Sequence, residues 1–302
     1  MSWFGVFALF VSLFPITLYA QVMESLAPNP QTGFQQIRIW LPDQDRSSTP
    51  LEMVQVPSGQ FEMGTPRDEY GRWSNEFETH TVILTKPFWA SKYEVTQEQW
   101  RALVGRELEL LDNRGKGPNH PVYNVNWWDI QEFLDKMNAL GFGTFRLPTE
   151  AEWEYFCRAG TSGQFWFGDV LAPGRSPDDL FPLLDPFLWY QQNGLSKTHP
   201  AGEKSANPWG IHDLHGNVSE YCNDYFQSTS SLGVLTDPQG PKYGDPPKYS
   251  HVIRDGNYDM PPEYCRSGMR GYFFLTNNER SKFVGFRIVR DVEVAVEDWA
   301  VY

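Results

Sequence analysis

Alternation of apolar and polar residues predicts short strands at both ends of the chain. Residues 53–64 (MVQVPSGQFEMG) alternate around a Pro-Ser-Gly turn, as a β-hairpin does. Further strand-like runs cover 79–84, 88–93, 252–254 and 285–289. Residues 21–49 lack a sustained pattern, apart from one candidate strand at 37–41, so we expect a linker there.

Three helices are predicted, each where a Thr or Asn cap precedes an apolar stripe. The caps are Thr96, Asn126 and Thr149, and the expected helices cover 96–104, 127–140 and 150–158. Residues 161–250 are rich in Pro, Gly and Asp and carry little helix or strand pattern. A loop region this long inside a domain needs another source of rigidity. The expected class is α+β, with few helices and much ordered loop.

Composition and charge narrow the range of partners. The chain has 302 residues, 16% of them aromatic, and a formal net charge of −13. A protein this acidic repels phosphate backbones, so we expect no nucleic-acid partner. Its content of hydrophobic residues, 40%, is enough to bury a core and excludes a wholly disordered chain.

The first twenty residues predict export. Residues 3–20 carry no charge, are apolar almost throughout and end in Leu-Tyr-Ala. This pattern is typical of a secretory signal peptide, which we place at residues 1–20. The protein would then be periplasmic or extracellular, with no membrane span once the signal is removed. The alternative is an uncleaved N-terminal anchor, because 18 apolar residues are just long enough to span a bilayer.

The cysteine count is odd. Cys157, Cys222 and Cys265 allow at most one disulfide, and their spacing fits neither a zinc ribbon nor a CxxC redox motif. We therefore expect buried, unreactive thiols.

Several motifs occur in order along the chain: PSGQFEMG at 57–64, YEVTQ at 93–97, RLPTEAEWE at 146–154, NPWG at 207–210, DLHGN at 213–217 and GFR at 285–287. In this order and spacing they resemble the formylglycine-generating enzyme (sulfatase-modifying factor) domain family. The resemblance covers residues 50–291 and leaves residues 292–302 as an acidic C-terminal tail. It implies a C-type-lectin-like fold, rich in loops, with bound calcium.

The resemblance also implies a chemistry that this chain does not fully match. Enzymes of the family oxidise a sulfatase cysteine to formylglycine with O₂, holding Cu(I) between two cysteines. Here Cys265 falls at the second cysteine position, Met260 at the first, and Asn257 replaces a serine. One thiolate cannot make a two-sulfur Cu(I) site, so we do not expect copper. The same stretch also fits a cysteine-free branch of the family, in which Cys265 is a core residue.

Calcium is the metal that the resemblance favours. Asp213, Gly216, Val218 and Glu220 match the family's calcium loop, with carboxylates from Asp213 and Glu220 and main-chain carbonyls from Gly216 and Val218. Hard oxygen ligands of this mixed kind suit Ca²⁺. The alternative is that the two carboxylates only cap turns.

Two functions follow from these observations. The first is an exported binding or interaction module, stabilised by calcium, whose partner is an unknown protein or peptide. The alternative is a copper-dependent formylglycine-generating oxidase, or a related oxidoreductase, in which Cys265 is the only candidate catalytic residue.

Overall fold

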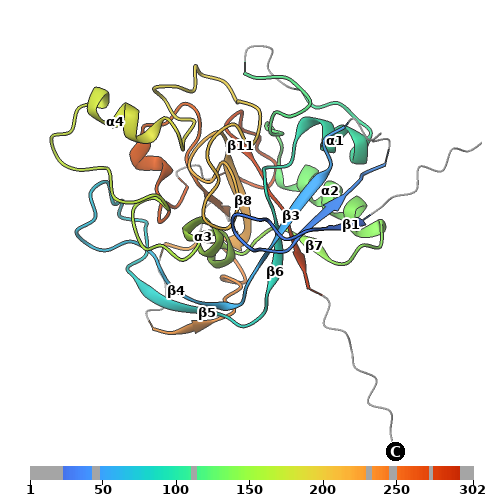
Figure 1. Cartoon of the computed structure of the whole chain (residues 1–302), viewed down its shortest axis with the longest axis horizontal. Helices are drawn as coiled ribbons and strands as arrows, with labels where there is room; N and C mark the ends of the chain where they lie inside the picture. The colour runs from blue at the N-terminus through green and yellow to red at the C-terminus, as the bar shows by residue number, and fades with distance from the viewer. Residues whose placement is uncertain are drawn as a thin grey trace, which may run out of the picture.

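A six-stranded antiparallel sheet runs through the middle of the molecule (Figure 1). The computed structural model describes residues 23–42, 48–109, 114–228, 233–244, 250–271 and 275–292. In spatial order the strands of the large sheet are β1 (Met23–Leu26), β2 (Gln36–Ile39), β3 (Leu51–Val56), β6 (Phe88–Ser91), β12 (Val289–Asp291) and β7 (Phe145–Arg146).

Two small sheets flank it. One has the order β10 (His251–Arg254), β8 (Ser219–Tyr225) and β11 (Val284–Gly285), and the other β4 (Gly59–Met63), β5 (His80–Leu84) and β9 (Leu235–Thr236). The β8–β11 and β5–β9 pairs are parallel, whereas the other pairs are antiparallel. Antiparallel sheets with a few separate helices confirm the α+β class.

The three predicted helices are confirmed as α1 (Gln97–Val104), α2 (Trp127–Ala139) and α3 (Glu150–Arg158). Each begins with the expected cap, whose side chain accepts a hydrogen bond from a main-chain N–H of the first turn. A fourth helix, α4 (Pro177–Leu184), begins at Ser176 with a capping box that the sequence analysis did not detect. A 3₁₀ turn covers Pro262–Cys265. In Figure 1, α1 and α2 lie at one end of the molecule and α4 at the other.

Two expectations were wrong. Residues 21–49 are not a linker throughout, because β1 and β2 extend the large sheet and Ile39 is completely buried in its core. The runs around the Pro-Ser-Gly turn do not pair as a hairpin, since β3 pairs with β2 and β6 while β4 pairs with β5. Residues 161–250 are mostly loop, as expected, and their described part contains α4, β8 and β9 as regular elements.

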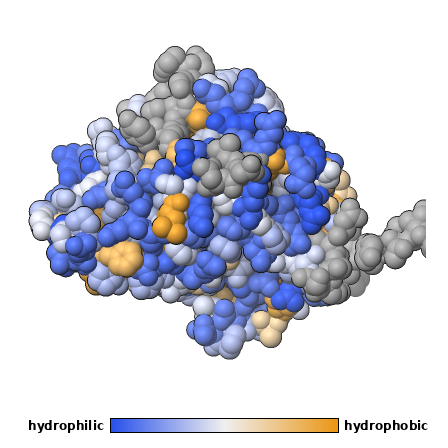
Figure 2. Space-filling model, turned by 90° about the horizontal axis from the view of Figure 1, so that it is seen from above, coloured by the Kyte–Doolittle hydropathy of each residue, from blue (hydrophilic) through white to orange (hydrophobic). Residues whose placement is uncertain are grey.

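The core is divided into three clusters. One lies where α1 and α2 pack, with Trp100 stacked on Phe133. The second surrounds α3 and includes Trp153, and the third contains Phe165 and Cys265. The face seen in Figure 2 is mainly hydrophilic, with small separate hydrophobic spots.

No helix in the described part of the chain is long and apolar enough to cross a membrane. The expected signal peptide at 1–20 and most of the acidic tail, 293–302, lie outside the described residues.

The position of β2 predicts a stability effect that a linker would not show. Replacing Ile39 by Ala should lower the free energy of unfolding by about 2–5 kcal/mol, because a fully buried side chain is truncated. Urea unfolding followed by tryptophan fluorescence measures the change. Gln35→Ala, at an exposed position just before the same strand, should stay within about 0.5 kcal/mol of wild type. Equal, small effects of both changes would contradict the assignment of β2 to the core.

Candidate functional site

The turn at 213–217 packs against the segment that begins at Arg254, and main-chain strain is concentrated where they meet. Asp213, Asn217 and Asp255 all adopt positive φ, at 54°, 64° and 68°. The N–H of Gly216 donates to both carboxylate oxygens of Asp255, at 2.8 Å each. Gly216 is required there, because a Cβ would lie 2.1 Å from the carbonyl oxygen of Trp189. Clustered strain of this kind is typical of functional sites.

Glu220, at the start of β8, is fully engaged by its neighbours. Both of its carboxylate oxygens accept hydrogen bonds from the Arg287 guanidinium at 2.6–2.9 Å, and Oε2 also accepts from the Trp153 indole at 2.7 Å. The Glu220 and Arg287 side chains are completely buried. Glu220 therefore already has a cationic partner inside the protein.

Asp213 has a different environment. Its Oδ2 accepts from the N–H of Gly202 at 2.6 Å, but its Oδ1 is buried and makes no hydrogen bond. Glu94 has the same deficit: Oε1 accepts from the side-chain amide of Asn217 at 3.0 Å, whereas Oε2 is buried without a partner. Burial raises the pKa of Asp213 to about 6 and, together with the nearby Asp213 carboxylate, raises the pKa of Glu94 well above its usual range. Two unsatisfied carboxylate oxygens are what a bound cation would need.

The carboxylates that the sequence predicted for calcium therefore differ in availability. Asp213 offers a free oxygen and fits a cation, whereas the oxygens of Glu220 are occupied by Arg287 and Trp153. Glu94 was missed because its motif is separated from Asp213 by more than a hundred residues. Over the described ranges, no three Asp, Glu, His or Cys side chains are arranged as a complete metal site.

Cys265 is buried and held away from solvent. Its side chain is 0% exposed, and a Cβ added to Gly256 would lie 2.5 Å from its sulfur, so no space remains beside the thiol on that side. Burial raises the pKa of the thiol well above its usual range, which disfavours the thiolate that Cu(I) would need. Cys157 and Cys222 are also free and buried. The residues at the expected copper position do not fit that metal.

His215, in the same turn, has a structural role. Its Nδ1 donates to the carbonyl of Cys265 at 2.8 Å, and its Nε2 accepts from the N–H of Trp166 at 3.3 Å. Both ring nitrogens are thus used by the neutral imidazole. Burial lowers the pKa of His215 to about 3, so the ring stays neutral at ordinary pH.

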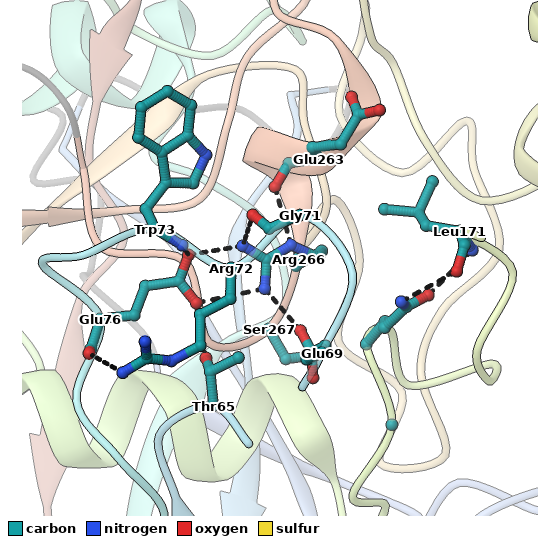
Figure 3. Close-up of polar contacts among 12 residues, drawn as sticks. Thr65, Glu69, Gly71, Arg72, Trp73, Glu76, Leu171, Glu263, Arg266 and Ser267 are labelled. Carbon is teal, nitrogen blue, oxygen red and sulfur yellow. Dashed lines mark hydrogen bonds and ion pairs between the residues drawn. The ribbon is translucent and has the colours of Figure 1, made fainter. Parts of the chain in front are cut away.

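Arg266 fixes a surface loop beside this segment (Figure 3). Its guanidinium is buried and donates to Glu69 and to both carboxylate oxygens of Glu76, at 2.5–3.1 Å. It also donates to the carbonyls of Gly71 and Glu263. Arg266 therefore joins the loop from 65 to 76 to the segment at the 3₁₀ turn. Sequence reasoning missed this contact because the partners are 190 or more residues apart.

The loop exposes aromatic residues. The Tyr70 and Trp73 side chains are 41% and 36% exposed, and the Trp73 ring lies 5.0 Å from that of Tyr264, centroid to centroid. Large aromatic side chains on a rigid loop are typical of binding surfaces.

The chain is similar in sequence to several known proteins. A family model described as the sulfatase-modifying factor enzyme 1-like domain matches residues 40–292. A formylglycine-generating enzyme from Streptomyces coelicolor is 31% identical over 212 residues, which are 69% of this chain and 62% of the relative. The chaperone protein LppX of Paenibacillus barcinonensis is 29% identical over 185 residues, or 46% of this chain and 63% of that protein.

A solved structure of similar shape supports the fold. Treponema denticola variable protein 1 superposes with a TM-score of 0.67 at 24% identity, covering 82% of this chain and 98% of that one. The fold is thus the C-type-lectin-like one that the motifs predicted.

The Arg266 contacts predict a large loss of stability on mutation. Arg266→Met should lower the free energy of unfolding by about 3–5 kcal/mol, because two carboxylates lose their buried cationic partner. Arg67→Met, in the same loop, removes a surface ion pair to Glu78 and should cost less than about 1 kcal/mol. Denaturant unfolding of both variants checks the difference, and a similar, small loss for each would show that the Arg266 contacts do not hold the loop.

Proposed function

The chain belongs to the sulfatase-modifying factor enzyme 1-like domain family, and from this membership we propose that it is an exported binding module without formylglycine-generating activity. The observation that carries the proposal is the state of Cys265, the only cysteine at the expected copper position, whose thiol is buried and has a raised pKa. Family membership gives the scaffold, whereas the activity depends on the site residues.

Two further observations support binding. The loop held by Arg266 exposes Tyr70 and Trp73 next to Tyr264, so a partner would meet aromatic side chains whose main chain is already fixed. Preorganised anchors of this kind lose little entropy on association. One relative is a chaperone by name, which supports a protein or peptide as the partner class.

A peptide assay tests the first part of the proposal. Incubating the purified protein with copper and a Cys-x-Pro-x-Arg peptide should leave the peptide mass unchanged, because a single buried thiol cannot supply the two thiolates of a Cu(I) centre. Mass spectrometry of the peptide and copper stoichiometry of the protein are the measurements. Copper-dependent conversion to formylglycine that disappears in Cys265→Ala would instead establish the oxidase alternative.

We also propose a calcium site, with Asp213 and Glu94 as its carboxylate ligands in place of Asp213 and Glu220. The oxygens of Asp213 and Glu94 that lack partners would hold the ion, and the main-chain carbonyls of Gly216 and Val218 stay candidate ligands. The ion would supply the positive charge that these two carboxylates lack. Glu220 would stay paired with Arg287.

Thermal unfolding with and without calcium separates these roles. Calcium at a hundredfold excess over Kd should stabilise the wild type by about 2.7 kcal/mol, because the ion binds only the folded state. Glu94→Gln should abolish most of that gain without lowering the melting temperature of the calcium-free protein. Glu220→Gln should lower the melting temperature in both conditions, because Arg287 loses its partner.

Glu107→Gln is the matched control, since this carboxylate is exposed and lies outside the turn. It should leave the calcium effect intact. An unchanged wild-type melting temperature on addition of chelator would refute the calcium proposal, and the binding proposal would be unaffected.

A further inference from the structure

A pocket of about 320 Å³ lies apart from the turn at 213–217 and from the expected copper position at 260–265. Its walls come from the N-terminal end of α3, the C-terminal end of β8, the start of β5 and the segment 238–241. Neither Met260, Cys265, Asp213 nor Glu220 lines it. The pocket is open to solvent, so a small molecule can enter it.

Two polar groups of this pocket, on Asp224 and His80, can accept hydrogen bonds from a ligand. Asp224 is 5% exposed; its Oδ2 accepts from the N–H of Glu150 at 2.9 Å, and its Oδ1, which lies against the main chain of Gly240 on one side, accepts from no other described residue than Asp224 itself. His80 is 6% exposed, and its Nδ1 lies 2.9 Å from the carbonyl of Glu78. The proton of the neutral ring must therefore be on Nδ1, so Nε2 presents a lone pair. A second acceptor thus belongs to the lining of the same pocket.

The cation of the pocket is not available to a ligand. Arg270 donates through Nε and Nη2 to both oxygens of Glu150, and through Nη1 to the carbonyls of Asn75 and Gln227. Its guanidinium also lies 3.7 Å from the ring centroid of Phe77. An anionic ligand would therefore find no free positive charge here, whereas a ligand that donates hydrogen bonds would find two acceptors.

The rest of the lining is largely apolar and includes Met63, Phe77, Leu235, Pro238 and Pro241. Such a surface suits the hydrocarbon body of a ligand, with a single polar group at one end. The net charge of −13 adds a long-range attraction for cations.

We propose that this pocket binds a small primary amine carried on an apolar body, with the ammonium group donating to Asp224 Oδ1 and His80 Nε2. The ammonium group would donate a charge-assisted hydrogen bond to a carboxylate of which only Oδ2 accepts from a neighbouring residue. The apolar body would lie against the proline and aromatic side chains of the lining. This inference is independent of the proposed calcium and partner sites.

The ionisation of Asp224 supports the same ligand class. Burial, and the nearby carboxylate of Glu150, raise the pKa of Asp224 to about 7. The charged groups around it are Glu150 and Glu152 on α3 and Arg270, and the neutral His80 ring lines the same pocket. Because the amine stays protonated, binding should strengthen as pH rises and Asp224 loses its proton.

Isothermal titration calorimetry with 2-phenylethylamine and its neutral analogue 2-phenylethanol tests the proposal on the full chain. At pH 8 the amine should bind at least about tenfold more tightly than the alcohol. Its affinity should fall about tenfold between pH 8 and pH 6. Asp224→Asn should weaken amine binding by at least about tenfold, while its remaining side-chain oxygen can still accept from the N–H of Glu150.

Asp135→Asn, an equal change of charge at an exposed position on α2, is the matched control and should bind as the wild type does. If Asp224→Asn does not fold, the discrimination between amine and alcohol and the pH dependence of the wild type decide the question. Equal binding of the two probes, no binding of the amine, or wild-type affinity in a folded Asp224→Asn variant would each overturn the proposal. Asp224 would then serve only to hold the start of α3.

Discussion

Buried pairing between arginines and carboxylates is the interaction on which the rest of this structure depends. Arg254, Arg266, Arg270 and Arg287 are each at most 1% exposed, and each is paired with at least one glutamate from an earlier part of the chain. Taking such charges out of water is costly, and leaving one partner without the other costs several kcal/mol. A segment that supplies one partner is therefore stable in its position only when the segment with the other partner is folded against it.

These arginines also explain how a loop-rich chain is held without long sheets. A guanidinium has five N–H donors in a fixed plane, so one side chain can bind a carboxylate and main-chain carbonyls at once. Arg254 reaches the carbonyl of Ser267, Arg270 that of Gln227, and Arg287 that of His212. Carbonyls that lie outside any sheet thus obtain buried hydrogen-bond partners. These contacts are one source of the rigidity that a long loop region needs.

What could be predicted from the sequence was mostly local. The helices α1, α2 and α3 were predictable because the cap and the apolar stripe lie within a few residues of each other. The strand β2 was predicted only as an isolated candidate at 37–41, because four residues show neither its pairing with β3 nor its burial in the core. The motif resemblance identified the turn at Asp213 but not its neighbour Glu94, nor the contact between Glu220 and Arg287. Those contacts depend on tertiary packing, which has no local pattern.

The order of the charged partners along the chain has a consequence for synthesis. Glu69, Glu76, Glu150, Glu154 and Glu220 all leave the ribosome before the arginines that pair with them, in some cases by about 190 residues. During translation the long-range buried ion pairs of these four arginines must therefore stay unformed until late, whereas the local pair of Glu154 with Arg158 can form earlier. The domain should acquire its structure in a late, concerted step once Arg287 is available. A nascent chain of this kind stays unfolded for longer than one whose contacts are local, and thus remains able to pass through a membrane channel before it folds.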